Sequence, residues 1–253
     1  MNFGATLRIA GPLSAYASYA EGFTMPDVGR ILRAVNTPGQ DVDAFLDLEP
    51  VVADNVELGV ERQGAALSAS AAYFWSNSDQ GALLVLRAGD VFAVQRQRTE
   101  IEGLELSATW RTPLQGLSLS AAYAALEGRS DSNGDGRVDQ DLDGANLSPD
   151  RLNLAVEYAR GAFQARLQGQ AYLSRSFADL PSAGRFTGYE VADAMLRWMA
   201  PVGAFTLTVA NLLDESYVTY HSQTVRPTDN ARFFAGRGRS VSRAQRAPAR
   251  AAP

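Results

Sequence analysis

The stretch with the clearest chemistry is DSNGDGRVDQDLDG, residues 131–144, which has acidic or amide side chains at every second position except Arg137. A calcium loop needs this pattern, because the ion takes oxygen ligands from alternate positions, glycine makes the sharp turn at position six, and glutamate closes the loop at position twelve. The matching residues are, in order, Asp131, Asn133, Asp135, Gly136 and Asp139. The twelfth position departs from the pattern, since it holds Leu142.

Two interpretations of this loop stay open. Asp141 and Asp143 flank Leu142 and could replace the glutamate only after rearrangement, which predicts at best weak calcium binding, at the millimolar end typical of extracellular modules. The alternative is a solvated loop tip, because Asp, Asn and Gly are also the residues that favour turns. No helical pattern flanks the loop, which favours the second interpretation.

Composition excludes most other chemistry. The chain has no cysteine, which removes disulfides and thiolate sites, and His221 is its only histidine. No nucleophile, base and orienting group come together in the sequence, so we expect neither an enzyme nor a resident cofactor. All 23 basic residues are arginine and the net charge is -5. A nucleic acid is not an expected partner, because binding phosphates requires an excess of positive charge.

The elements that position these residues read as strands. Phe205, Leu207 and Val209 alternate with Thr206 and Thr208, which is the period of two typical of a strand. The same alternation covers residues 55–61, 67–75, 104–110, 117–123, 152–158, 163–173 and 192–198. Helical spacing is nowhere sustained.

The connections between these strands alternate between two kinds. Short ones carry the glycine or proline of tight hairpins, at residues 10–12, 62–64, 112–116, 160–162 and 201–203. Long polar insertions separate them, at residues 23–53, 77–89, 128–148, 174–187 and 214–233. This alternation predicts an antiparallel up-and-down meander with the short turns at one end and the long loops at the other.

Strand length and aromatic placement favour a membrane barrel over a soluble sandwich. A tilted strand that crosses a bilayer needs about 9–11 residues, against about 5–6 in soluble sheets, and residues 67–77, 117–127 and 163–173 each read as long strands. Aromatic residues near the short turns are Trp110, Tyr158, Phe163, Trp198 and Phe205. Those toward the long loops are Tyr19, Phe23, Tyr73, Trp75, Tyr172 and Tyr189. Two such belts are the girdles of an all-β, antiparallel up-and-down transmembrane β-barrel.

The polar face of the strands supports the same prediction. It carries Glu57, Glu61, Glu105, Gln164, Arg166, Gln168, Gln170, Asp193 and Arg197. Such charge is unfavourable in a dry core, whereas the water-filled or plugged lumen of a barrel accepts it while lipid takes the apolar face. The segment MNFGATLRIAGPL lacks the pattern of a signal peptide, and no apolar run approaches the roughly 20 residues of a membrane-spanning helix.

Several motifs resemble TonB-dependent outer-membrane receptors. VANLLDESYVTY (residues 209–220) and FFAGRGRS (233–240) resemble the penultimate strand of these receptors and the start of the closing one. YASYAEGFTMPDVGR (16–30), DNVELGVE (54–61) and IEGLELSATW (101–110) resemble earlier strands, so that the similarity covers roughly residues 13–242. GYEVADAMLRWMAPVGAFTLTVANLLDESY is most similar to receptors for ferric hydroxamate and aerobactin-type siderophores.

The resemblance implies a fragment of a larger receptor. About eleven strands would form a partial barrel, the C-terminal half of a 22-stranded one, over residues 1–242. Neither a plug domain nor an energy-coupling box precedes Met1, and residues 243–253 (RAQRAPARAAP) are expected to be a disordered tail rich in Arg, Ala and Pro. The implied partners are outer-membrane lipid of a Gram-negative bacterium, a ferric siderophore and, for the complete protein, the TonB energy-coupling complex.

Candidate ligand residues follow from loop position. A ferric siderophore is often anionic with an apolar rim, which arginine and aromatic side chains on outer loops can bind. The candidates are Arg30 and Arg33 in the first long loop, and Tyr217, Tyr220, His221 and Arg226 in the last.

Two other functions stay open from the sequence. One is a passive porin-like or adhesin-like barrel, and the other is a soluble calcium-binding β-domain such as a lectin. The first differs from a receptor in lacking a plug, and the second in staying monomeric without detergent.

Overall fold

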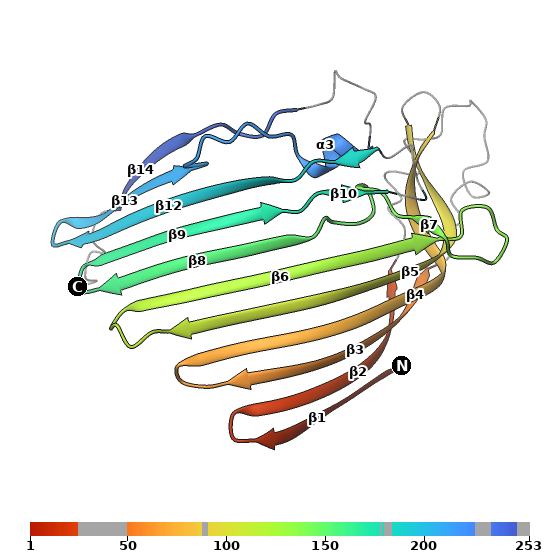
Figure 1. Cartoon of the computed structure of the whole chain (residues 1–253), viewed down its shortest axis with the longest axis horizontal. Helices are drawn as coiled ribbons and strands as arrows, with labels where there is room; N and C mark the ends of the chain where they lie inside the picture. Colours follow the sequence, from red (N-terminus) through yellow and green to blue (C-terminus); the bar gives the residue numbers. More distant parts are fainter. Residues whose placement is uncertain (25–49, 88–90, 178, 180–183, 226–233, 247–253) are drawn as a thin grey trace, which may run out of the picture.

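The computed structural model describes all residues except 25–49, 88–90, 178, 180–183, 226–233 and 247–253. One curved antiparallel sheet dominates it, with strands side by side in chain order (Figure 1). These strands are β1 (Asn2–Ala10), β2 (Leu13–Thr24), β3 (Val51–Gln63), β4 (Leu67–Arg87), β5 (Val91–Arg111), β6 (Leu117–Ser130), β8 (Arg151–Arg160), β9 (Phe163–Tyr172), β12 (Tyr189–Ala200), β13 (Gly203–Ala210) and β14 (Ser240–Arg246). The prediction of about eleven strands in an up-and-down meander is confirmed.

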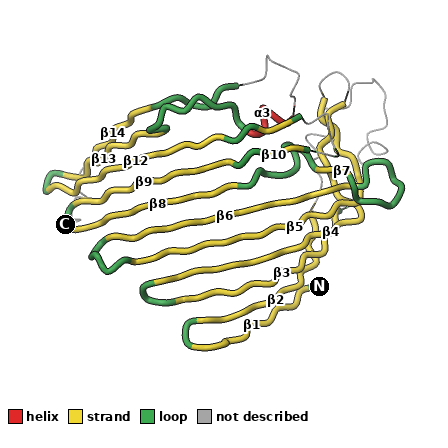
Figure 2. Tube along the Cα trace, viewed as in Figure 1, coloured by secondary structure: helices red, strands yellow, loops and turns green. Residues whose placement is uncertain are grey.

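The short turns lie at one end of the sheet and the long connections at the other, here named the turn end and the loop end (Figure 2). Gly116 shows why the turn end needs glycine: its φ is 88°, and a Cβ there would stand 2.1 Å from the carbonyl oxygen of Ala159. Only glycine adopts this conformation without strain. The small elements, β7 (Gln140–Asp141), β10 (Arg175–Ser176), β11 (Arg185–Phe186) and α3 (Tyr220–Val225), all belong to the loop end.

One predicted loop is instead strand. Residues 77–89 read as a polar insertion, but β4 continues to Arg87 and β5 begins at Val91, with a register shift between Ser78 and Gly81. The period of two is hidden because residues 77–80 are polar at consecutive positions and residues 82–86 are apolar at consecutive positions, so neither run alternates. The prediction of a loop was wrong for residues 77–87, and residues 88–89 lie outside the described residues.

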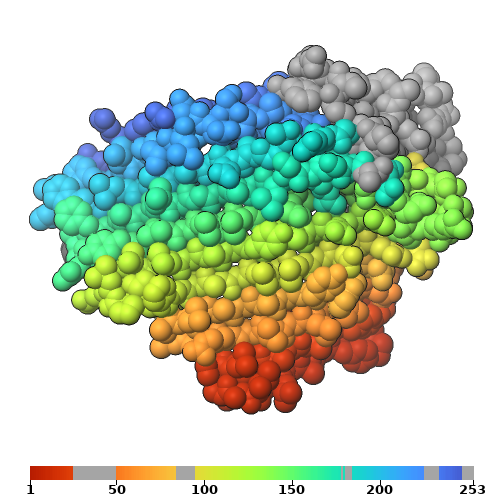
Figure 3. Space-filling model, in the orientation of Figure 1, coloured from red at the N-terminus to blue at the C-terminus, as the bar shows by residue number. Residues whose placement is uncertain are grey.

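The pairing register sorts the side chains onto two faces. All nine polar residues predicted to share a face do so, as in the pairs Gln168 with Asp193 and Gln164 with Arg197; this is named the polar face. The opposite, apolar face exposes large hydrophobic residues, among them Leu58, Leu106, Leu154, Leu167, Leu196 and Leu207. Side chains fill the spaces between neighbouring strands over the face seen in Figure 3.

Aromatic residues on the apolar face form the two expected belts, with a correction. Phe163 stacks on Trp198 at the turn end, with ring centroids 6.2 Å apart, and Tyr73 meets Trp75 farther from the turns, within β4, at 4.6 Å. Tyr172 and Tyr189 were assigned to the loop-end belt, but their pairing places them on the polar face. A position one residue along a strand changes the face, and only the register settles it.

The described sheet is open, with β1 at one edge and β14 at the other. The end of β14 differs from the prediction of a tail from residue 243, because Arg243 to Arg246 pair with β13. The edge of β13 offers backbone donors and acceptors to any residue except proline, and the first proline of this segment is Pro248. In the part of the chain that the structure describes, no helix is long and apolar enough to cross a membrane.

Candidate functional site: side chains that hold the loops over the polar face

At the loop end, two clusters of buried side chains hold the long loops against the polar face. The aromatic cluster consists of Phe177, Phe186 and Tyr220, packed against Tyr172 and Tyr189. The leucine cluster consists of Leu83, Leu142 and Leu147, packed against Ile101 and Leu126. Because Tyr172, Tyr189, Ile101 and Leu126 are all polar-face positions of the sheet, the loops fold over the side that would be the lumen of a barrel.

The aromatic cluster is built from edge-to-face and stacked rings. The rings of Phe186 and Tyr220 meet edge to face with centroids 4.8 Å apart, and the rings of Tyr189 and Tyr217 stack at 4.4 Å. Such pairs add about 0.5–1.5 kcal/mol to the burial of the rings. The cluster therefore fixes α3 and the segment before β12 on the wall.

The leucine cluster explains the break in the calcium motif. Leu142, which occupies the position of the missing glutamate, is only 2% exposed and packs with Leu147 against the sheet. The amide of Leu142 also donates to the carbonyl of Gly128, 2.9 Å away. Residue 142 therefore anchors the loop to the wall, and a carboxylate at this place would lose its hydration.

The acidic tip of the same loop is held by its own backbone. The carboxylate of Asp131 accepts the amides of Gly134 at 2.7 Å and Gly136 at 2.9 Å, and the carboxylate of Asp135 accepts the amide of Arg137 at 2.8 Å. Asn133 accepts the amide of Asp135 in the same way, while Asp139 is exposed. These side-chain to backbone bonds are those of turn-forming Asp and Asn. Among the described residues, no group of three or more His, Asp or Glu side chains is arranged to hold a metal ion.

The loop between β6 and β8 meets α3 at Gly144. A Cβ on Gly144 would stand 1.7 Å from Oγ1 of Thr224 and 3.0 Å from the ring of Tyr220, so only glycine allows this approach. Thr224 is 1% exposed, and its hydroxyl donates to the carbonyl of Tyr220 at 2.9 Å. Two loops that are far apart in the sequence are thereby brought together.

Asp143, beside this contact, has an altered acidity. Burial raises the pKa of the Asp143 carboxyl above its ordinary value, and the raise is opposed by hydrogen bonds from Ala145 and Asn146 and by the charge of His221. The carboxylate accepts the amide of Ala145 at 3.0 Å and the side chain of Asn146 at 2.9 Å. The acid at this junction therefore favours its neutral form more than an exposed aspartate does.

The predicted ligand residues have different fates. Tyr217 is half-buried against Tyr189, and Tyr220 is 7% exposed within the aromatic cluster, where burial raises the pKa of its phenol to about 12 despite the opposing charge of Arg175. His221 is exposed on α3, close enough to Asp143 to affect its pKa. The remaining candidates, Arg30, Arg33 and Arg226, lie outside the described residues.

Two residues that position the loops were not singled out from the sequence. The guanidinium of Arg175 donates to the carbonyl of Leu126 at 2.7 Å and lies 5.5 Å from the centre of the Phe177 ring. Asn211 has a φ of 50° and binds backbone atoms of Glu215 and Arg237, each at 2.9 Å. The sequence signals for these residues were an arginine two positions before a phenylalanine, shortly after a strand, and the asparagine that begins NLLDESY.

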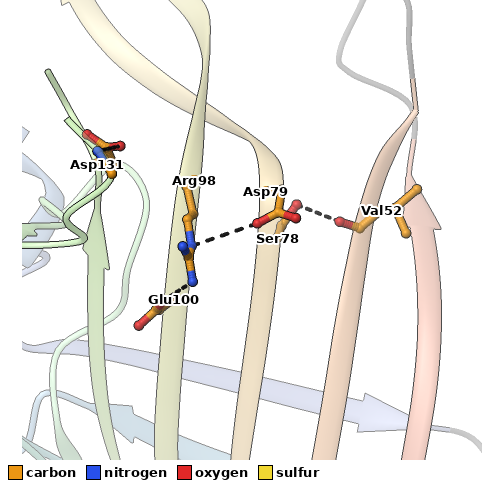
Figure 4. Close-up of polar contacts among 7 residues, drawn as sticks. Val52, Ser78, Asp79, Arg98, Glu100 and Asp131 are labelled. Atoms are coloured by element: carbon orange, nitrogen blue, oxygen red, sulfur yellow. Dashed lines mark hydrogen bonds and ion pairs between the residues drawn. The ribbon is translucent and has the colours of Figure 1, made fainter. Parts of the chain in front are cut away.

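A series of polar contacts also connects the neighbouring strands β3, β4, β5 and β6 near the loop end of the sheet (Figure 4). The hydroxyl of Ser78 donates to the carbonyl of Val52 at 2.5 Å, and Arg98 contacts Asp79 and Glu100 at 3.8 and 3.1 Å. The amide of Asp131 continues the chain by donating to the carbonyl of Arg98 at 3.0 Å. The start of the acidic loop is therefore fixed to the sheet.

A curved meander with one apolar face, two aromatic belts and loops folded over its polar face has the features that the walls of outer-membrane barrels share: an apolar outside, aromatic girdles and a polar inside. Residues 2–212 match the family model described as TonB dependent receptor-like, beta-barrel. The chain belongs to this family, whose members are transport receptors.

Among relatives, the chain is similar to the ferric aerobactin receptors of Escherichia coli and Klebsiella pneumoniae. Each is 25% identical over 233 residues, which cover 88% of this chain and 31% of the receptor. The chain therefore spans about a third of the length of these relatives.

Solved structures share the fold. The copper transporter OprC superposes with a TM-score of 0.75 at 18% identity, over 93% of this chain and 37% of the transporter. The ferric yersiniabactin uptake receptor FyuA from Yersinia pestis superposes with a TM-score of 0.65 at 20% identity, over 87% of this chain and 33% of the receptor. These similarities show the architecture of the chain, but they do not identify its cargo, because the two proteins carry different ones.

Proposed function

We propose that this chain forms part of the wall of an outer-membrane receptor that binds a ferric siderophore at the loop end and imports it with energy from the TonB complex. The observation that carries the proposal is the match to the receptor family over residues 2–212, together with the 25% identity to ferric aerobactin receptors over 88% of this chain. The fold alone does not distinguish a siderophore from other cargo, because a copper transporter has the same fold.

The two faces of the sheet have different roles in such a wall. The apolar face, with leucines such as Leu154 and Leu196 about half exposed, meets outer-membrane lipid. The polar face lines the lumen, where its polar side chains pair across strands: Arg166 bonds to Glu157, and Gln168 donates to Asp193 at 3.1 Å. The wall therefore presents a hydrated surface to whatever passes along it.

The loop end supports a binding surface for an anionic complex with an apolar rim. Tyr217 and His221 lie on or next to the loop that the aromatic cluster holds over the polar face, and we assign them to ligand contact together with Arg30, Arg33 and Arg226. Arginine recognises anionic oxygens through paired hydrogen bonds, and aromatic rings contact the apolar rim. Tyr220, with its ring buried, supports this surface from below.

A chimeric receptor tests the proposal. In the ferric aerobactin receptor of E. coli, the region matched by this chain is replaced by residues 1–253, and uptake and binding of radiolabelled ferric aerobactin are measured in cells that lack the native receptor. We expect binding, and uptake that requires TonB. The variant Arg226→Ala should weaken binding, while Arg137→Ala, the same charge change at the exposed tip of another loop, should not.

Each alternative predicts a distinct result. If the chimera folds in the membrane, binds no siderophore and accumulates copper, the cargo is copper and not a siderophore. A chimera that conducts ions freely in planar bilayers and binds neither would instead be a passive barrel. Equal binding by Arg226→Ala and the parent chimera would remove Arg226 from the site.

A further inference from the structure

The tip of the acidic loop contains two residue pairs that can rearrange without an enzyme. Asn133–Gly134 is the only Asn–Gly pair in the 253 residues, and Asp135–Gly136 follows it directly. Glycine favours this reaction, because it has no side chain to keep its amide nitrogen away from the side-chain carbonyl of the residue before it. All four residues are exposed, so water reaches them. The tip therefore has the composition and the exposure that a spontaneous covalent modification requires.

The reaction needs water as its only co-reactant. In the first step the Gly134 nitrogen bonds to Cγ of Asn133, the bond from Cγ to Nδ2 breaks, and the Gly134 amide proton leaves with the side-chain nitrogen as ammonia. Water then opens the cyclic succinimide at either carbonyl carbon, which gives aspartate or isoaspartate at position 133. At Asp135 the leaving group is water, so the product there is isoaspartate or the original aspartate.

A single carboxylate holds both attacking nitrogens. The Gly134 amide donates to Oδ1 of Asp131 at 2.7 Å, and the Gly136 amide donates to Oδ2 of the same residue at 2.9 Å. The succinimide nitrogen is planar, like that of a peptide bond, so the new bond to Cγ forms along the direction that each N–H now takes toward Asp131. Ring closure at either pair therefore requires that a hydrogen bond to Asp131 break first.

The side chains under attack are held as well. Oδ1 of Asn133 accepts the amide of Asp135 at 3.0 Å, and Nδ2 of Asn133 donates to Oδ2 of Asp135 at 3.1 Å. Oδ1 of Asp135 accepts the amide of Arg137 at 2.8 Å. These bonds restrain each Cγ from turning toward the nitrogen that follows it. All of them lie within residues 131–137, so this protection is separate from the anchor of the loop at Leu142.

We propose that Asn133–Gly134 and Asp135–Gly136 form a latent modification site, which Asp131 protects and which converts to succinimide and isoaspartate when the tip of the loop opens. Conversion at Asn133 adds a permanent negative charge to the tip. Isoaspartate also lengthens the backbone by a methylene group, so the original hydrogen bonds cannot form again. An opening of the tip is thereby recorded in the covalent structure. The proposal depends neither on the cargo nor on the role of the chain in a receptor.

Ageing of the full chain at mildly alkaline pH tests the proposal, with the protein refolded in detergent compared with the same protein unfolded in guanidinium. Trypsin cleaves after Arg129 and Arg137, so one peptide, residues 130–137, carries both pairs. Mass spectrometry of this peptide measures deamidation, and labelling by isoaspartate methyltransferase measures isoaspartate. The variants are Asp131→Ala, which removes both acceptors, and Asp139→Ala, which removes an exposed carboxylate of the same loop.

We expect both conversions to be roughly 10- to 100-fold slower in the folded parent than in the unfolded protein, which is the factor expected where a charge-assisted hydrogen bond must break first. Asp131→Ala should bring both rates close to those of the unfolded protein. Asp139→Ala should leave the rates of the parent unchanged. Equal rates in the folded and the unfolded parent would overturn the proposal.

A second Asp–Gly pair in the same digest separates opening of the tip from opening of the whole loop. Asp143–Gly144 lies in the next tryptic peptide, residues 138–151, and is packed against Thr224. Its conversion should be the same in the parent and in Asp131→Ala. If Asp131→Ala speeds conversion at Asp143 as much as at Asn133, the fold of the whole loop protects the tip, and the role of the Asp131 carboxylate is overturned.

Discussion

Gly144 and Thr224 join two loops that are 80 positions apart, and their approach leaves no room for a side chain on residue 144. We expect Gly144→Ala to separate the loop between β6 and β8 from α3, at a cost of roughly 1–3 kcal/mol typical of overpacking. Hydrogen exchange of α3 amides in the refolded chimera measures the separation. Gly169→Ala, which adds the same methyl where no atom lies within 4 Å, is the control and should leave α3 unchanged.

Leu142→Glu would complete the calcium motif in sequence, yet we expect it to release the loop and not to create a calcium site. The side chain at this position is 2% exposed, and an unpaired carboxylate there would lose its hydration. Calcium titration by calorimetry and cleavage after Arg137 by trypsin report the two outcomes. Leu142→Met, which conserves volume, should cost less than about 1.5 kcal/mol. Tight calcium binding by Leu142→Glu would contradict this account of the loop.

The tip of the acidic loop should keep its order without calcium. The carboxylate of Asp131 already binds the amides of Gly134 and Gly136, so Asp131→Ala should speed trypsin cleavage after Arg137 several-fold, equally in EDTA and in calcium. Asp139→Ala, at an exposed position of the same loop, should have little effect. Protection of the parent loop that appears only when calcium is added would instead establish an ion site.

Asp143 should make the junction between the loop and α3 sensitive to pH. Because burial raises its pKa in the folded state, Asp143 stabilises the junction in its neutral form. This contribution is fully present below the ordinary value of 3.8 and is lost as the pH rises through the higher folded-state pKa. Exchange of the Ala145 and Asn146 amides should therefore slow toward acid pH relative to its intrinsic rate. Asp143→Asn should remove this extra dependence, and an unchanged profile would contradict it.

Arg243 should destabilise the last strand in a bilayer. Its pairing with Leu207 places it on the apolar face near the middle of β13, where an arginine that faces lipid costs about 2–4 kcal/mol. Arg243→Leu should raise the stability of the refolded chimera by about this amount in urea titrations in vesicles. Ser242→Leu, one residue earlier and on the polar face, should give no such gain.

The sequence predicted those parts of the fold that depend on local pattern. The strand predicted from the alternation in residues 152–158 and the glycine-bearing turn at 160–162 depend only on residues that are close in sequence. Both predictions are confirmed. The prediction of a loop failed for residues 77–87 because their polar residues (77–80) and apolar residues (82–86) each stand in a consecutive run, without the alternation of a strand. Residues 243–246 failed because their order comes from the edge of β13 and not from their own composition.

The site was less predictable, because it depends on contacts between distant loops. The spacing around Asp131 identified a turn, but nothing local indicated that Leu142 packs with Leu83, some 60 positions earlier. Tyr220 was chosen for its loop, whereas its environment is set by Phe177 and Phe186 from another loop. A residue's place in a loop predicts exposure, and only tertiary packing shows which loop residues are buried.

The order of the strands also has a consequence for how this wall forms. Each strand of the sheet pairs with its neighbours along the chain, so no pairing needs to wait for a distant segment to arrive. The entropy of closing a hairpin grows only slowly with the length of its loop, and contacts between sequence neighbours favour rapid folding. The wall can therefore assemble one hairpin at a time, with the contact of Gly144 and Thr224 formed last, after the strands that carry both loops are in place.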